Sequence, residues 1–230
     1  MGLVVMTSCE DYLDINTNPN KPTEVPVQLL MGEASFRTGD NIQLAGDITS
    51  YYVQYLASPN AFGSKDIHDP QPYDDTWEAF YRLLSDIADM EQLAKEEGLS
   101  HYLAAAKVMK AINLGLLLDL WGDVPYTQAF FAEHLLPEYD DDEVLYDEVL
   151  KLHDEVLVEF AKPVEQQQFA EDDFIYGGSI DNWVAMAWSL KARYLQHLSN
   201  TAKYDATAVL AAVQQGFTSN GQNGDISYFT

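Results

Sequence analysis

Residues 101–121 read HYLAAAKVMKAINLGLLLDLW and are followed directly by GDVPY at 122–126. Apolar or small side chains fall on almost every side of a 3.6-residue helix here, which predicts a helix packed by neighbours all round. Gly122 can take the left-handed conformation that ends a helix, and Pro125 prevents the helix from resuming. Four polar residues make the run too polar to span a membrane: Lys107, Lys110, Asn113 and Asp119.

Helical patterns and one long loop precede this segment. Helical spacing is present from Leu29 to about Arg37 and again from Ile42 to Leu56. Between Ala57 and Tyr73 the chain carries three prolines and a glycine, which predicts a loop.

A second helix is expected between that loop and the buried segment. Asp74 or Asp75 can cap its first turn. Gly98 ends it and Ser100 caps the buried helix, so the two must fold back on each other as an antiparallel hairpin. Its expected apolar face is Trp77, Tyr81, Leu84 and Ala88, widened by Phe80, Ile87 and Leu93.

Three further helices are expected after the Gly122–Pro125 break. The acidic run Asp140–Glu143 places negative charge at the positive end of the first, Trp183 lies on the second, and Asp205 caps the third, which stops at Gly216. No strand pattern is visible. Helices in successive pairs predict an all-α fold, a tetratricopeptide-like array of helical hairpins. The expected apolar stripes are Leu145, Val149, Leu152, Val156 and Phe160, then Trp183, Ala187, Leu190, Tyr194 and Leu198.

Composition excludes several classes of partner. With 37 acidic and 12 basic residues the formal net charge is −25, so nucleic acid and anionic membrane surfaces are repelled. A hydrophobic content of 47% places the chain among ordered globular proteins. The single cysteine, Cys9, excludes an internal disulfide.

Three segments, in order along the chain, carry recognisable motifs. Residues 9–23 read CEDYLDINTNPNKPT, and residues 120–126 read LWGDVPY. IYGG at 175–178 leads to Trp183 and then to SLKARY at 189–194. Together they resemble the SusD/RagB family of outer-membrane nutrient-binding lipoproteins, although members often carry Asn where this chain has Trp188.

The resemblance implies a fold, a location and a partner. The expected fold is the SusD-like α-α superhelix, and the protein is expected to be an outer-membrane, cell-surface lipoprotein that binds a glycan or other nutrient. By the same resemblance it would work with a SusC-like TonB-dependent transporter in uptake. We expect residues 1–8 to be a remnant of a lipoprotein signal and residues 9–26, rich in Asn, Pro and Thr, to be an extended tail. Because family members are about twice as long, residues 27–230 would form the helical domain without its C-terminal part.

The resemblance also implies a lipid anchor at Cys9. Small residues precede it in Met6-Thr7-Ser8-Cys9, as at the end of a lipoprotein signal. No Lys or Arg lies upstream, and the apolar run is too short for a complete signal, so a truncated start and an ordinary thiol both stay open.

Neither catalysis nor a metal site is expected. The chain lacks the phosphate-loop, nucleophile-elbow, His-Glu-x-x-His and Cys-x-x-Cys patterns, so we expect no enzyme activity and no cofactor. Oxygen ligands alternate at Asp14, Asn16, Asn18 and Asn20 as in a calcium loop, but Pro19 stands where that loop needs glycine. A polar tail with Asx turns is the preferred interpretation.

The loop between Ala57 and Tyr73 is the expected ligand site, because loops on rigid scaffolds carry binding residues and similar proteins use loops in this region. The alternative is that its aromatic residues only attach the loop to the scaffold. Two other functions stay open: a tetratricopeptide-like peptide or protein scaffold, and, less favoured, an α/α glycoside hydrolase. The candidate ligand-binding residues are Asn60, Phe62, Asp66, His68 and Tyr73.

Overall fold

The computed structural model describes residues 25–130, 134–164 and 170–225. Within these ranges there is no β-strand, and Val124 and Asp140 form an isolated bridge. The expected all-α fold is therefore confirmed. Six α-helices make up the described chain: α1 (Val27–Tyr52), α2 (Asp74–Glu96), α3 (Ser100–Trp121), α4 (Asp142–Phe160), α5 (Ile180–His197) and α6 (Ala206–Gln215), with short 3₁₀ turns η2 (Leu198–Asn200) and η3 (Asn220–Gln222).

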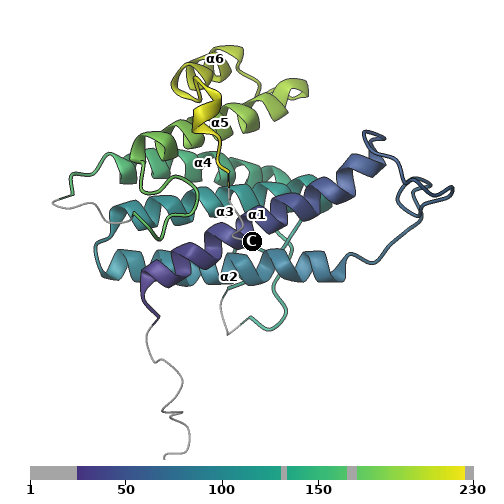
Figure 1. Cartoon of the computed structure of the whole chain (residues 1–230), viewed down its shortest axis with the longest axis horizontal. Helices are drawn as coiled ribbons and strands as arrows, with labels where there is room; N and C mark the ends of the chain where they lie inside the picture. The colour runs from purple at the N-terminus through teal and green to yellow at the C-terminus, as the bar shows by residue number, and fades with distance from the viewer. Residues whose placement is uncertain (1–24, 131–133, 165–169, 226–230) are drawn as a thin grey trace, which may run out of the picture.

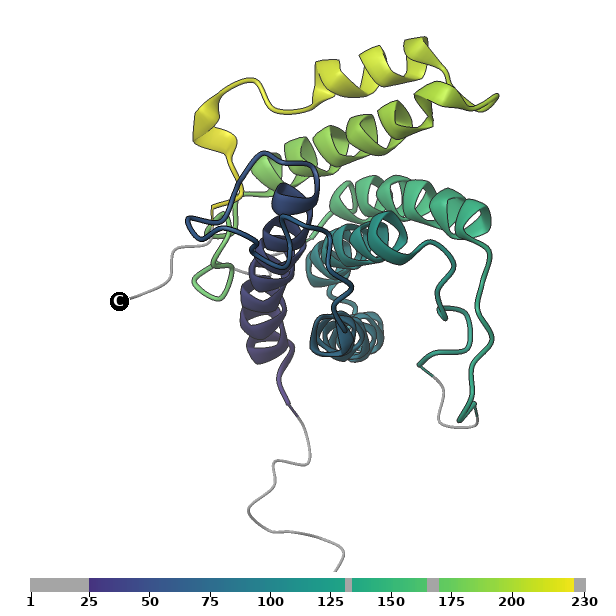
Figure 2. The ribbon, with the colours of Figure 1, turned by 90° about the vertical axis from the view of Figure 1, so that its right-hand side faces the viewer.

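The helices stack in chain order. From α2 onward each helix packs against the next, and α1 lies against both α2 and α3. Figure 1 shows α1 crossing the stack obliquely, and Figure 2 shows α5 and α6 as a pair on the side away from α2. The expected hairpin of α2 and α3 is present, with Gly98 at φ 72° in the tight connection.

Helix α3 is the centre of the core, as its apolar sequence predicts. Most of its side chains are buried, including Tyr102, Met109 and Leu114. One hydrophobic cluster joins it to all of α1, α2, α4 and α5, a second joins it to α4 and Tyr194, and a third joins it to α1 and α2. The other helices are therefore held in place through α3.

Helix α1 is one continuous helix, so the expectation of two separate helical segments was wrong. Polar residues in its middle are buried against α3 and bonded there. The amide nitrogen of Asn41 donates to Asn113 Oδ1 at 2.8 Å, and Asn113 Nδ2 lies 3.2 Å from Thr38 Oγ1. These hydrogen bonds join residues more than seventy positions apart. They satisfy the buried polar side chains that interrupt the apolar helical pattern in the sequence.

The helix starts were predicted in part. Asp205 caps α6, as expected. At the start of α4, Asp141 accepts hydrogen bonds from Glu143 N and Val144 N, and it belongs to the acidic run that was expected there. Asp74 and Asp75 lie in the first turn of α2 but make no capping bond, and Ser100 is the first residue of α3 instead of its cap.

The buried face of α2 is rotated from the expected one. Trp77, Tyr81 and Ala88 are only half-buried. Phe80 and Ile87, expected to widen the face, are fully buried and form its centre with their neighbours. The difference arises because α1 and α3 both cover this helix, which broadens the apolar face beyond a single stripe.

The turn after α3 is fastened by Asp140. Gly122 has φ 75° and ψ −122°, a conformation outside the compact left-handed region but still one that favours glycine. Asp140 Oδ2 accepts from Tyr126 N and Thr127 N, both at 2.8 Å. Partial burial raises the pKa of Asp140, but the hydrogen bonds from Thr127 and Tyr126 outweigh it and hold the pKa below its ordinary value.

The IYGG motif is organised by a buried carboxylate, Asp173. Its Oδ2 accepts from Trp183 Nε1 at 2.7 Å and from Gly178 N at 2.9 Å. Its Oδ1 accepts from Ile175 N and Tyr176 N. Asp173 is 3% exposed, so this carboxylate joins the turn to the first turns of α5 inside the core.

Candidate functional site

The expected binding loop is present between α1 and α2, and it is closed at its base. Tyr52 ends α1 and Tyr73 precedes α2, and their hydroxyl oxygens lie 3.1 Å apart. Burial raises the pKa of Tyr73 to about 12, with the hydrogen bond between Tyr73 and Tyr52 as a further cause. A contact between the tips of these two side chains therefore links the two ends of the segment 53–72.

His68 strengthens the same closure. Its ring stacks on the ring of Tyr52 with centroids 5.1 Å apart and 15° between the planes. Its Nε2 lies 3.1 Å from the carbonyl oxygen of Tyr52. His68 and Tyr73 thus attach the loop to α1. Attachment of the loop to the scaffold was the alternative to ligand binding that the sequence left open for its aromatic residues.

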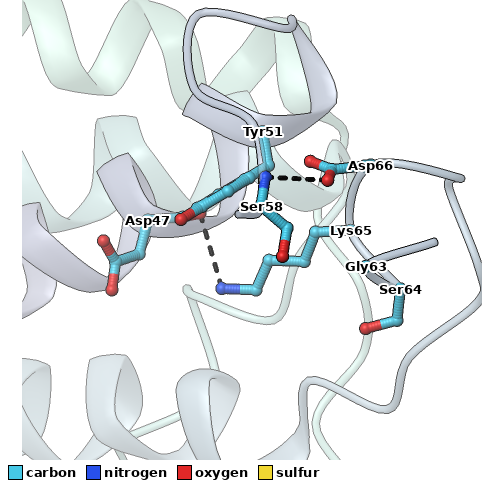
Figure 3. Close-up of a pocket in the computed structure, with 7 residues that line it drawn as sticks. All are labelled: Asp47, Tyr51, Ser58, Gly63, Ser64, Lys65 and Asp66. Atoms are coloured by element: carbon cyan, nitrogen blue, oxygen red, sulfur yellow. Dashed lines mark hydrogen bonds between the residues drawn. The ribbon is translucent and has the colours of Figure 1, made fainter. Parts of the chain in front are cut away.

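A pocket of about 290 Å³ lies where this loop folds back over the last turns of α1 (Figure 3). Asp66 shapes its wall, because Asp66 Oδ2 accepts a hydrogen bond of 2.8 Å from Ser58 N. A Cβ added to Gly63 would lie 2.6 Å from Ser58 Cβ, so the chain can pass there only as glycine. The lining residues are Asp47, Tyr51, Ser58, Gly63, Ser64, Lys65 and Asp66.

Lys65 crosses this pocket toward α1. Its Nζ lies 3.5 Å from the carbonyl oxygen of Asp47 and 5.5 Å from the centre of the Tyr51 ring. Among the described residues, no carboxylate pairs with Lys65, and the carboxylate of Asp47 has no hydrogen-bond or ion-pair partner. The pocket therefore offers charged groups of both signs that are not in an ion pair, beside an aromatic ring.

Asn60 and Phe62 lie on the exposed part of the loop. The backbone N–H of Asn60 donates to Ser58 Oγ, and its side chain is exposed. Phe62 is 85% exposed and has φ 64°, an uncommon conformation for a residue with a large side chain. Other large apolar side chains of the loop are exposed as well: Val53, Tyr55, Leu56 and Ile67.

Of the five predicted residues, only Asp66 lines this pocket. Asp66 lines the pocket, His68 and Tyr73 bind Tyr52, and Asn60 and Phe62 are exposed. Asp47, Tyr51 and Lys65 also line the pocket and were not among the predicted residues. Asp47 and Tyr51 lie one helical turn apart near the end of α1, within the segment that was expected to be helical.

Two further hollows lie on the other side of the stack. One, of about 360 Å³, is lined by Lys203, which pairs with Glu143 and Asp147. The other, of about 400 Å³, lies between α4, α5 and α6. There Lys191 pairs with Asp154 and lies 5.3 Å from the Trp188 ring, so the lysine of each hollow is already paired within the chain.

The part of the chain that the structure describes contains no group of three His, Cys, Asp or Glu side chains able to hold a metal ion. None of its helices is both long enough and apolar enough to cross a membrane. Cys9, the proposed anchor, and the oxygen-rich stretch from Asp14 to Asn20 lie outside the described residues.

Comparison with known proteins gives a consistent result. A SusD-like family model described as "Starch-binding associating with outer membrane" matches residues 19–229. No curated protein matches the chain significantly.

Solved structures with the same fold come from several bacteria. A SusD/RagB family protein from Bacteroides thetaiotaomicron is similar with a TM-score of 0.75 and 24% identity, covering 87% of this chain and 45% of that one. A SusD homologue from Bacteroides fragilis has a TM-score of 0.71 and 19% identity over 90% and 44% of the two chains. A chitin-binding SusD homologue from Flavobacterium johnsoniae has a TM-score of 0.65 and 18% identity over 81% and 43%. The chain thus spans less than half the length of these relatives.

Proposed function

Because this chain belongs to the SusD-like family, we propose that the complete protein captures glycans at the outer membrane for uptake and does not transform them. The observation that carries the proposal is the family match, which extends over residues 19–229 and so includes every described helix. The family is one of binding proteins associated with the outer membrane, and the chain shows no catalytic sequence motif.

The proposed glycan contacts come from the α1–α2 loop and the pocket beneath it. Sugars are recognised by charged or polar groups that bond their hydroxyls and by aromatic faces that cover their C–H surfaces. Asp47, Asp66 and Lys65 supply the first kind of group, and exposed Phe62 supplies the second. The closed base supports this proposal, since a loop fixed to a rigid helix can hold such groups in a constant geometry.

The proposed partner is a SusC-like TonB-dependent transporter, and the proposed membrane attachment is a lipid on Cys9. Both proposals follow from the family resemblance. A net charge of −25 supports the need for a covalent anchor, because it disfavours adsorption to an anionic membrane surface. Mass spectrometry of the protein made in a Gram-negative host tests the anchor, and an unmodified Cys9 contradicts it.

Calorimetric titration of the complete protein tests glycan capture, with maltoheptaose, chitohexaose, xylohexaose and a set of unstructured peptides. We expect binding of at least one oligosaccharide and no release of reducing sugar. Binding of peptides alone would favour the tetratricopeptide-like scaffold, and sugar release would favour a hydrolase.

A pocket variant connects the binding to the site. Lys65→Met removes a donor from the pocket, and we expect it to weaken the bound oligosaccharide about tenfold, as for loss of one hydrogen bond to a charged group. Lys95→Met, at the exposed end of α2, is the matched control and should bind like the wild type. Equal affinity in both variants would remove this pocket from the site.

A further inference from the structure

The pocket under the α1–α2 loop has an uneven charge. Two carboxylates, Asp47 and Asp66, and one ammonium group, Lys65, line it. The segment from Asp47 to Asp75, which includes the whole loop, has five acidic residues and a single basic one. A ligand in this pocket therefore meets a surplus of negative charge.

The single positive charge is directed inward. Figure 3 shows the Lys65 side chain extending toward α1, where its Nζ lies 3.5 Å from the Asp47 carbonyl oxygen and near the Tyr51 ring. A carbonyl dipole and the negative face of an aromatic ring both stabilise an ammonium group. The charge of Lys65 is thus partly satisfied by the chain itself.

The negative charge of Asp47 is, by contrast, available. Its side chain is exposed, and its carboxylate has no partner among the described residues. Asp66 retains accepting capacity on Oδ1, because only Oδ2 accepts the bond from Ser58. Carboxylate oxygens accept hydrogen bonds from sugar hydroxyls and amines, but they repel carboxylates and sulfates.

We infer that this pocket selects uncharged sugars, tolerates amino sugars and rejects acidic ones. The inference rests on the proposed glycan-binding function and names the class of glycan that the same site takes. The whole-chain charge of −25 acts in the same direction, because a polyanionic chain would be repelled along its approach as well as in the pocket.

The test compares different charge states of the same sugar backbone for binding to the complete protein. Chitohexaose is neutral, its deacetylated form is cationic, and its N-succinylated form is anionic. The same comparison is made with neutral maltoheptaose and its C6-carboxylated form. At low salt we expect the neutral form to bind, the cationic form to bind at least as tightly, and each anionic form to bind at least about tenfold more weakly, as expected for one like charge within a few ångströms.

Raising the salt concentration should reduce these differences, since exposed charges are screened. Asp47→Lys should recover most of the lost affinity for the anionic form. Asp89→Lys, at an exposed position on α2, makes the same change in net charge and should recover little. Equal recovery in both variants would assign the selection to overall charge and overturn the pocket as its source.

Two failures can be told apart. Tighter binding of the anionic form at low salt overturns the inference and leaves glycan capture standing. If the protein binds none of the five probes and none of the oligosaccharides named above, the proposed function is overturned and the inference with it.

Discussion

Gly115 of α3 lies directly under the side chain of Tyr194 of α5. A Cβ placed on Gly115 would be 2.1 Å from the Tyr194 hydroxyl oxygen and 2.4 Å from Cζ. The Tyr194 ring is buried, and its hydroxyl lies 3.5 Å from the carbonyl oxygen of Ala111. The absent side chain at position 115 therefore allows α5 to reach across to the central helix.

We expect Gly115→Ala to destabilise the protein by at least about 2 kcal/mol, because the added methyl group must displace a packed ring or the helix that carries it. Urea unfolding followed by circular dichroism measures the loss. Gly46→Ala in α1 is the matched control, since a Cβ there meets nothing within 4 Å. That change should stabilise the protein by about 0.5–1 kcal/mol through the helix preference of alanine. Equal effects at the two positions would contradict the close approach.

Asp173 should be essential to the start of α5. Asp173→Ala removes the acceptor of four hydrogen bonds, three from backbone N–H groups and one from the Trp183 indole, in a largely buried site. We expect a loss of about 3 kcal/mol in the free energy of unfolding. Asp181→Asn, in the exposed first turn of α5, is the control and should cost under about 1 kcal/mol. A small effect at Asp173 would show that the turn forms without its carboxylate.

His153 of α4 is fully buried, stacks on Tyr194, and has no hydrogen-bond partner on either ring nitrogen among the described residues. Burial and, as a smaller cause, the positive charge of Lys191 lower the pKa of His153 to about 4, with Asp154 acting in the opposite sense. The folded state therefore excludes a proton that the unfolded chain binds below its ordinary pKa of about 6.5.

Stability from His153 is thus present above pH 6.5 and is lost as the pH falls toward 4. The difference between the two pKa values predicts a loss of about 1.4 kcal/mol between pH 7.5 and 5.5. His153→Phe keeps a stacked ring and should remove this part of the pH dependence, measured as the difference between urea-unfolding profiles of the two proteins. Parallel profiles would show that His153 is not the group responsible.

Phe62→Ala tests the exposed part of the loop separately from its base. Phe62 is 85% exposed, so its removal should change the melting temperature by less than about 2 °C. If its ring covers a sugar face, affinity should fall about tenfold, the usual value of an aromatic contact. Leu210→Ala, at an exposed position on α6, should leave affinity unchanged. Unchanged affinity for Phe62→Ala would remove this residue from the glycan site.

Features with a local signal were predictable from the sequence. The all-round apolar pattern of α3 and the stripe from Leu145 to Phe160 in α4 correspond to buried side chains in the structure. In each helix the residue types and their spacing are enough to predict which side chains are buried. The loop before α2 was predictable for the same reason, because prolines and a glycine exclude regular structure there.

Features that depend on distant partners were not predictable. Asn41 and Thr38 read as a helix break until Asn113 is placed opposite them. Asp173 reads as one of many surface carboxylates until Trp183 returns to meet it. The pocket likewise requires Lys65 to lie against Asp47 and Tyr51, and this contact depends on how the loop folds back.

The hydrogen bond between Tyr52 and Tyr73 allows the sequence of the loop to vary independently of the helices that carry it. Because this side-chain contact ties both ends of residues 53–72 to the helices, we expect the length and composition of that segment to change with little effect on the packing of α1 and α2. We therefore expect changes confined to this segment to alter the proposed binding site while the helices beneath it keep their arrangement.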